Sequence, residues 1–225
     1  MNLRVHFHPF SSFCQKVLVA LYERDVPFAP VVVSLNEPDE LAALEALWPM
    51  AKFPVLRDDG ADRTIAEASL IVEYLDRVGG APPLVPQGAD AALATRLWDR
   101  VFDNYVEIPL QKAVSDCFRP AEKRDPRGVE EAKALLVRAY QLLERELEGS
   151  GRDWIAGEAF TLADCGAAPA LFYAAMVVPF SNHPALAAYY RRLRARPSFA
   201  PRRRRGPALP RILSAALAGS ARLIQ

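Results

Sequence analysis

Hydroxyl and thiol side chains cluster near the start of the chain, at Ser11, Ser12 and Cys14. Before them apolar and polar residues alternate, which predicts a strand, and after them apolar residues recur at helical spacing. We therefore expect the cluster at a helix N-terminus, where free N–H groups and the positive end of the helix dipole favour an anion. A hydroxyl that donates a hydrogen bond there would stabilise a thiolate nucleophile. The alternative is that Ser11 or Ser12 only caps the helix.

The elements that position this cluster follow the order β-α-β-α-β-β-α. The pattern predicts strands at residues 3–7, 28–34, 53–57 and 63–65, and helices at 12–26, 39–47 and 66–78. A βαβ start favours parallel pairing of the first two strands. The Asp-Gly step at Gly60 predicts the tight turn of an antiparallel hairpin.

The second half of the chain shows only helical periodicity. Helices are predicted from Ala91 to about Cys117, Val129 to Glu148, Leu162 to Met176 and Pro184 to Arg194, with Thr161 and Asp164 capping the third. The domains expected are an N-terminal domain at residues 1–80, a Pro-rich and Gly-rich linker at 81–89, an all-helical domain at 90–200 and a basic tail at 201–225.

Composition excludes several classes of protein. Of the 225 residues, 51% are apolar and 24% charged, and the net charge of +1 gives no general reason to expect nucleic acid. The run Arg202–Arg205 is interpreted as a solvated tail, the alternative being a nucleic-acid or membrane contact. No stretch is long and apolar enough to span a bilayer, and residues 1–10 lack a secretion signal. These features predict a cytoplasmic protein.

Metal and disulfide sites are not expected. The three cysteines are widely spaced and odd in number, which argues against a disulfide framework and a structural zinc site. His6 and His8 share one strand face, but nothing supplies a matched third ligand. We interpret both histidines as solvent-facing strand residues.

The residues from Ser11 to Val17, Ser-Ser-Phe-Cys-Gln-Lys-Val, resemble the active-site loop of the glutathione transferase superfamily. That loop is Ser-x-x-Cys or Cys-Pro-x-Cys before a Lys/Arg-Val pair. The resemblance implies a thioredoxin-like N-terminal domain that binds glutathione and an all-α C-terminal domain. In serine-type members the first residue supplies the catalytic hydroxyl, which here is Ser11, or Ser12 if the register differs by one. Cys14 is interpreted as a core residue, the alternative being the nucleophile of a thiol reductase.

A second segment, Trp48 to Leu56, is similar to the family's Asn-Pro-x-Gly-Lys-Val-Pro-Val-Leu. The resemblance implies that Pro54 follows a cis peptide bond and that the Phe53 backbone pairs with the cysteinyl backbone of glutathione like an added strand. Lys52 would lie near the glycyl carboxylate. Trp48 and Ala51 depart from the pattern.

A third segment, Ile65 to Asp76, is similar to the family's Glu/Gln-Ser-x-x-Ile-x-x-Tyr-Leu-Asp. The resemblance implies that Glu67 accepts from the γ-glutamyl amine and that the next residue holds the γ-glutamyl carboxylate at a helix N-terminus. Ala68 stands where the family has Ser, so the side-chain donor would have to come from Ser69. Thr161 to Asp164 and Arg196 to Phe199 resemble segments of the family's helical domain.

The function implied is a glutathione transferase acting in detoxification, in which glutathione, the co-substrate, attacks a small apolar electrophile without a metal. Trp98, Phe102 and Tyr105 are candidate lining residues for the electrophile, at helical spacing. The family implies a homodimer. Three alternatives remain: a glutathione-dependent isomerase, a thiol reductase using Cys14, and a non-catalytic carrier. The absent Ser at Ala68 favours the carrier.

Overall fold

The computed structural model describes residues 2–34, 36–78 and 82–199. Among these residues the chain divides into two compact units, residues 2–84 with 195–199, and Val85–Arg194. The first unit thus includes a short segment that sequence analysis assigned to the helical domain. The basic tail expected at residues 201–225 lies outside the described residues.

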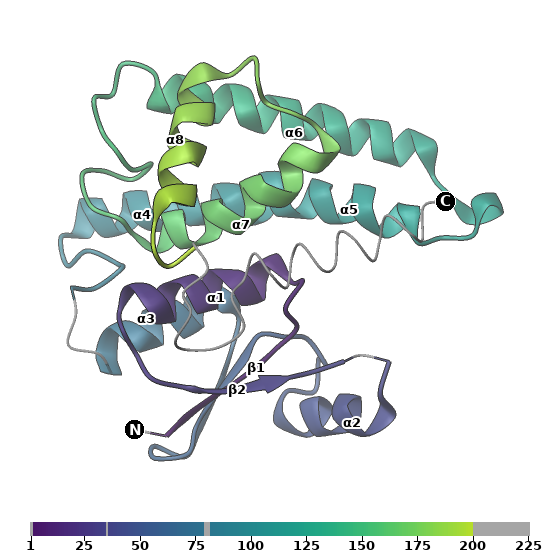
Figure 1. Cartoon of the computed structure of the whole chain (residues 1–225), viewed down its shortest axis with the longest axis vertical. Coiled ribbons are helices and arrows are strands. Elements are labelled where there is room, and N and C mark those ends of the chain that lie inside the picture. Colours follow the sequence, from purple (N-terminus) through teal and green to yellow (C-terminus); the bar gives the residue numbers. More distant parts are fainter. Residues whose placement is uncertain (1, 35, 79–81, 200–225) are drawn as a thin grey trace. The chain divides into compact units, whose positions relative to one another are not determined.

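The first unit has the predicted β-α-β-α-β-β-α order (Figure 1). Its elements are β1 (Leu3–Phe7), α1 (Ser12–Glu23), β2 (Ala29–Val32), α2 (Pro38–Leu47), β3 (Val55–Asp58), β4 (Arg63–Ala66) and α3 (Ala68–Val78).

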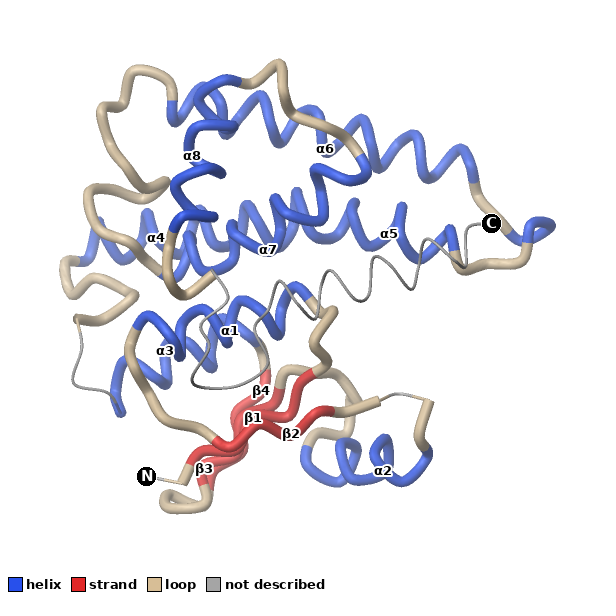
Figure 2. Tube along the Cα trace, in the orientation of Figure 1, coloured by secondary structure: helices blue, strands red, loops and turns tan. Residues whose placement is uncertain are grey.

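The strands form one sheet in the order β2-β1-β3-β4, seen in red in Figure 2. β1 pairs parallel with β2 and antiparallel with β3, and β3 pairs antiparallel with β4. The predicted parallel pair and the predicted hairpin are both confirmed, and the mixed sheet is thioredoxin-like. α1 packs beside α3, with Val17, Ile71 and Leu75 fully buried.

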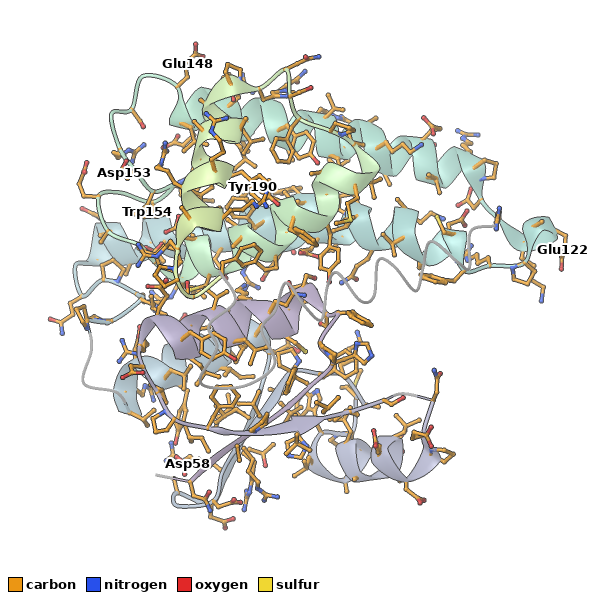
Figure 3. All side chains as sticks on the ribbon, viewed as in Figure 1. Asp58, Glu122, Glu148, Asp153, Trp154 and Tyr190 are labelled. Atoms are coloured by element: carbon orange, nitrogen blue, oxygen red, sulfur yellow. The ribbon has the colours of Figure 1, made fainter. Side chains whose placement is uncertain are left out.

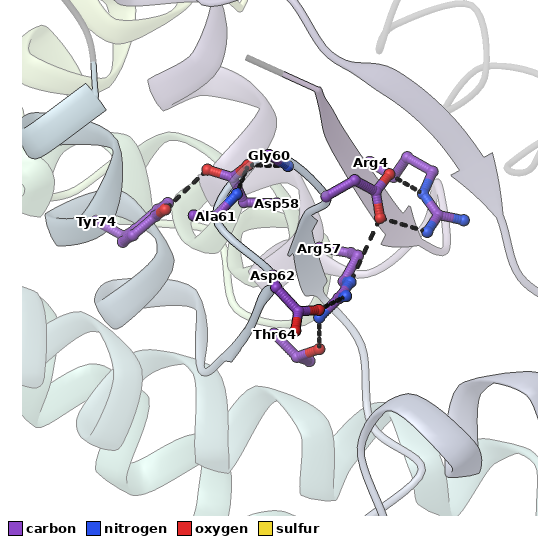
Figure 4. Close-up of polar contacts among 9 residues, drawn as sticks. Arg4, Arg57, Asp58, Gly60, Ala61, Asp62, Thr64 and Tyr74 are labelled. Atoms are coloured by element: carbon purple, nitrogen blue, oxygen red, sulfur yellow. Dashed lines mark hydrogen bonds and ion pairs between the residues drawn. The ribbon is translucent and has the colours of Figure 1, made fainter.

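The hairpin turn between β3 and β4 is tied to α3 by Asp58 (Figure 4). One carboxylate oxygen of Asp58 accepts the N–H groups of Gly60 and Ala61, at 2.9 and 3.1 Å. The other accepts the Tyr74 hydroxyl at 2.8 Å. The Tyr74 hydrogen bond lowers the pKa of Asp58, followed by the two backbone donors, against the opposing effect of burial. Asp58 therefore stabilises this turn as a carboxylate.

The regular elements described in the second unit are helices, as predicted. They are α4 (Ala89–Val101), the π-helical segment η1 (Phe102–Glu107), α5 (Ile108–Cys117), the 3₁₀ turn η2 (Ala121–Lys123), α6 (Pro126–Leu147), α7 (Leu162–Val177) and α8 (Pro184–Ala195).

The single long helix expected from Ala91 to Cys117 contains a π-helical segment in its middle. There the Ile108 N–H donates to the Asp103 carbonyl, five residues earlier. Pro109 follows directly and has no N–H to continue the ordinary four-residue register. The change of register is a physical consequence of this proline, which the periodicity alone did not predict.

The core of the second unit is built around the N-terminus of α7. The buried Asp164 carboxylate accepts the Thr161 N–H at 2.8 Å and the Tyr189 hydroxyl at 2.6 Å, so its predicted capping role is confirmed. Burial raises the pKa of Asp164 in spite of these donors. On α8, Tyr190, labelled in Figure 3, packs edge to face against Phe180, with ring centroids 5.5 Å apart.

The segment at residues 195–199 attaches to the C-terminal end of α1. The Arg196 guanidinium donates to both carboxylate oxygens of Glu23, at 2.7 and 2.5 Å, and the Ser198 hydroxyl donates to the same carboxylate. These contacts place the segment in the first unit.

Candidate functional site

The turn between β1 and α1 places Ser11 at the helix N-terminus. The Ser11 N–H donates to the His8 carbonyl at 3.1 Å, and the Gln15 side chain donates to the Pro9 carbonyl at 3.0 Å. Ser11 is the N-cap of α1, and its hydroxyl oxygen accepts the Cys14 N–H at 3.3 Å. Ser12 is the first helical residue and is buried. The half-buried Ser11 is thus the capping residue that sequence analysis considered as the alternative.

A capping hydroxyl still has a hydrogen to donate, because a serine oxygen accepts through its lone pairs and donates through its O–H. The bond from the Cys14 N–H uses a lone pair of Ser11 only. Accepting one hydrogen bond also polarises the hydroxyl as a donor. Capping and thiolate stabilisation are therefore compatible at Ser11.

Cys14 lies inside the first unit, with no exposed surface. Burial raises the pKa of the Cys14 thiol to about 12, although the Ser11 hydrogen bond acts in the opposite direction. The thiol is neutral near pH 7, and a neutral thiol is a poor nucleophile.

The Phe53–Pro54 peptide bond is cis, as the resemblance predicted. Among the described residues, no backbone hydrogen bond uses the N–H or C=O of Phe53. The Phe53 side chain and Trp48 pack against a small core formed by Val33, Leu44 and Val55.

The other two residues of interest in this loop are Lys52, which is exposed, and Ala51. Ala51 has a φ of 51°, in the left-handed region that favours glycine. This explains physically why the family pattern has Gly at the position of Ala51.

The start of α3 brings Glu67, Ala68 and Ser69 together. Glu67 has a φ of 67°, an uncommon conformation for a non-glycine residue, and its carbonyl accepts the Ile71 N–H at 2.9 Å. Glu67 is exposed, whereas Ala68 is 6% exposed. The Ser69 hydroxyl oxygen accepts a hydrogen bond from the Lys16 ammonium at 2.9 Å. The N–H groups of the first turn have no partner within the helix, as at every helix N-terminus.

Sequence analysis missed two residues at this site, Lys16 and His8. The Lys16 side chain from α1 is 1% exposed and reaches α3 through Ser69. The His8 ring stacks on the Phe53 ring, with centroids 5.6 Å apart and planes 18° apart. Both contacts join segments distant in the sequence, so no local pattern signals them.

The expectation that both histidines face solvent was wrong for His6. His6 is 8% exposed and His8 is half-buried. Burial lowers the pKa of each imidazole, and for His6 the nearby Arg4 guanidinium lowers it further. β1 is a central strand between β2 and β3, and His6 is paired with Val31 on one side and Val55 on the other, so neighbouring side chains flank it.

The candidate lining residues of the helical unit differ in exposure. Trp98 and Phe102 are buried, at 7% and 0% exposed, whereas Tyr105 in η1 is 49% exposed. Within residues 2–34, 36–78 and 82–199, no group of three His, Cys, Asp or Glu side chains is arranged to hold a metal ion. In the same ranges, every helix is too short or too polar to cross a membrane.

Comparison with known proteins identifies both halves of the chain. Residues 5–83 match the family model of the glutathione S-transferase N-terminal domain, and residues 108–197 match that of the C-terminal domain. FtsZ-localized protein A of Caulobacter vibrioides is 30% identical over 207 residues, which cover 88% of this chain and 89% of that protein. Probable maleylacetoacetate isomerase 2 of Drosophila melanogaster is 24% identical, covering 84% of this chain and 82% of that protein.

A solved structure shows the same similarity in three dimensions. The glutathione S-transferase of Methylobacillus flagellatus with glutathione bound superposes with a TM-score of 0.78 and 27% identity, covering 87% of this chain and 96% of that one. The segments that carry Ser11, Phe53 and Glu67 all lie within the matched N-terminal domain.

Proposed function

The chain belongs to the glutathione S-transferase family, and we propose that it is a glutathione transferase in which the Ser11 hydroxyl holds the glutathione thiol as a thiolate. The thiolate attacks an apolar electrophile, forming a sulfur–carbon bond. The observation that carries the proposal is the geometry of Ser11: its oxygen accepts the Cys14 N–H at the start of α1, and its hydroxyl hydrogen, which also interacts with the Cys14 thiol, is a donor at the helix N-terminus. A donor and a helix N-terminus both favour the charged form of a bound thiol.

The rest of the first unit supplies groups for the remaining parts of glutathione. Phe53 offers a backbone N–H and C=O without partners among the described residues, which suits pairing with the cysteinyl backbone. Glu67 accepts from the γ-glutamyl amine, and the first N–H groups of α3 bind the γ-glutamyl carboxylate. Lys52 is exposed and pairs with the glycyl carboxylate.

The test measures the ultraviolet thiolate band of bound glutathione near neutral pH. We expect the band with the wild type and its loss in Ser11→Ala. Ser12→Ala is the matched control, because that neighbouring hydroxyl is buried and is not the cap. A band of full intensity in Ser11→Ala would rule out the catalytic role of Ser11.

Removal of the cap also weakens α1 by about 1 kcal/mol, so folding must be monitored separately. Ser11→Asp provides this control, because aspartate caps a helix as well as serine does but has no hydroxyl hydrogen at neutral pH. We expect Ser11→Asp to keep the wild-type melting temperature and to lose the thiolate band.

A second candidate function is glutathione binding without transferase chemistry. Two observations favour it: Ala68 lacks the hydroxyl of the family pattern, and the relative at 30% identity is named for its localisation with FtsZ. Glutathione binding with no thiolate band in the wild type would support this candidate over the transferase.

Two other activities stay among the candidates, and mutation separates only the reductase from the transferase. The relative named as a maleylacetoacetate isomerase keeps glutathione-dependent isomerisation among the candidates, and it requires the same thiolate. A thiol reductase requires Cys14 as a thiolate, which the raised pKa of the buried thiol disfavours. Loss of activity in Cys14→Ser with survival in Ser11→Ala would identify the reductase.

We also propose that the protein is a homodimer. Support comes from large apolar side chains at the surface of α3 and α4: Leu70, Leu93 and Leu97 are 56%, 69% and 56% exposed. Sedimentation of the wild type against Leu97→Glu tests this, and a monomeric wild type would refute it.

A further inference from the structure

His8 occupies a fixed position between the two loops of the candidate glutathione site. It opens the four-residue turn that ends at Ser11, closed by the Ser11 N–H to His8 carbonyl bond of 3.1 Å. Its ring stacks on Phe53, with centroids 5.6 Å apart, and meets Phe10 edge to face at 5.2 Å. The imidazole is therefore held beside both the Ser11 turn and the Phe53 loop.

The hydrogen bonding of the ring determines which nitrogen carries the proton. The Phe10 N–H donates to His8 Nδ1 at 3.3 Å, so Nδ1 is an acceptor. The proton of the neutral imidazole is then on Nε2, because the bond made by one ring nitrogen sets the tautomer of the other. Burial lowers the pKa of His8, which keeps the ring neutral near pH 7. His8 thus provides an N–H donor and has no lone pair left to act as a base.

We propose that the His8 Nε2–H is a second hydrogen-bond donor to the glutathione sulfur, acting beside the Ser11 hydroxyl. This inference rests on the proposed binding of glutathione and extends it to a residue outside the motif. The first carrying observation is that His8 and Ser11 end the same turn. The second is that the ring covers the residue whose backbone would pair with the cysteinyl group, the part of glutathione that bears the sulfur.

Three variants separate the donor from the structural contacts of the ring. His8→Asn keeps an acceptor for the Phe10 N–H, because the oxygen of an Asn side chain can accept from the backbone N–H two residues later. This variant lacks the donor at the position of Nε2. His8→Phe keeps the aromatic stack on Phe53 and loses both polar contacts. His8→Gln returns an amide N–H near the position of Nε2.

The readout is the pH at which half of the bound glutathione is thiolate, from titration of the ultraviolet band. We expect this midpoint to rise by about one pH unit in both His8→Asn and His8→Phe, as the loss of one hydrogen bond to a charged group implies. In His8→Gln we expect the midpoint to rise less, because the amide N–H replaces part of the donor function. S-methylglutathione has no ionisable thiol. Expressed as a free energy, the change in affinity for it should be smaller than the change in the titration midpoint.

The outcomes distinguish this inference from the proposed function. If the wild type forms thiolate and His8→Asn has the same titration midpoint, the donor role of His8 is refuted and the role of Ser11 stands. If the wild type binds glutathione without forming thiolate, the transferase proposal and the His8 inference fail together. A rise in His8→Phe alone would identify a structural role through the turn and would also overturn the donor role.

Discussion

The Lys16 ammonium nitrogen lies 2.9 Å from the Ser69 hydroxyl oxygen, so a buried charge carried by α1 is held at the first turn of α3. The N-terminus of α3 also carries the positive end of its helix dipole. Both effects favour a carboxylate at this point. Ser69 engages Lys16 through its oxygen, and the neighbouring Ala68 offers no side-chain donor to a ligand.

Replacing Ala68 with Ser adds the hydroxyl of the family pattern at this anion site. We expect Ala68→Ser to bind glutathione about tenfold more tightly, because a hydrogen bond to a charged group contributes roughly 1.5–3 kcal/mol. Calorimetric titration measures the change, with Ala68→Cys as a control of similar size and weaker donor strength. Equal affinities in the wild type and Ala68→Ser would place the γ-glutamyl carboxylate elsewhere.

Replacing Ala51 with Gly removes backbone strain. Ala51 has a φ of 51°, and the left-handed region costs an L-residue roughly 1–2 kcal/mol, part of which is offset by the greater freedom of Gly in the unfolded chain. We expect Ala51→Gly to raise the free energy of unfolding by about 0.5–1 kcal/mol, measured by urea denaturation. Ala61→Gly, at a turn residue whose own φ is not positive, should give no such gain. Equal gains in both variants would contradict the explanation.

Replacing Tyr74 with Phe tests the carboxylate of Asp58. We expect Tyr74→Phe to lower the free energy of unfolding by about 1 kcal/mol at pH 7, because the carboxylate loses a donor. The pKa of Asp58 is lower in the folded protein than in the unfolded chain, so the stabilisation is present above about pH 4 and is lost as the pH falls further. Urea denaturation should therefore show a smaller difference in the free energy of unfolding between wild type and Tyr74→Phe at pH 3 than at pH 7.

Tyr22→Phe is the control for that measurement, because the Tyr22 hydroxyl forms no hydrogen bond within the described part of the chain. It should show no comparable pH dependence. A difference between wild type and Tyr74→Phe that is the same at both pH values would mean that the Tyr74 hydroxyl does not lower the pKa of Asp58.

The three cysteines should differ in reactivity toward a thiol reagent at pH 8. Cys117 is exposed, whereas Cys14 and Cys165 are buried. We expect one rapid modification in the native protein, abolished in Cys117→Ser, and the other two only after unfolding. A second rapid thiol that disappears in Cys14→Ser would restore the reductase as a candidate.

The order of elements was predictable because it depends on local signals. Apolar spacing defines β1 and α1, and the Asp-Gly step at Gly60 defines the hairpin turn. The cis bond before Pro54 came from the resemblance, since most X-Pro bonds are trans and nothing local distinguishes this one.

The remaining parts of the site depend on contacts between distant segments. The stack of His8 on Phe53 and the bond from Lys16 to Ser69 form only after the sheet and helices pack together. A histidine in an alternating strand pattern gives the same sequence signal whether or not side chains of neighbouring strands surround it. For that reason the burial of His6 was predicted wrongly.

The contacts of Glu23 with Arg196 and Ser198 have a consequence for synthesis on the ribosome. The first unit contains both early residues and residues 195–199, so its last contacts cannot form until the intervening helical unit has been translated. The N-terminal residues emerge first, and yet Glu23 makes these contacts only after residues 85–194 have been translated. During translation, Glu23 at the end of α1 therefore has no contact with Arg196 or Ser198, whereas in the complete chain it contacts both.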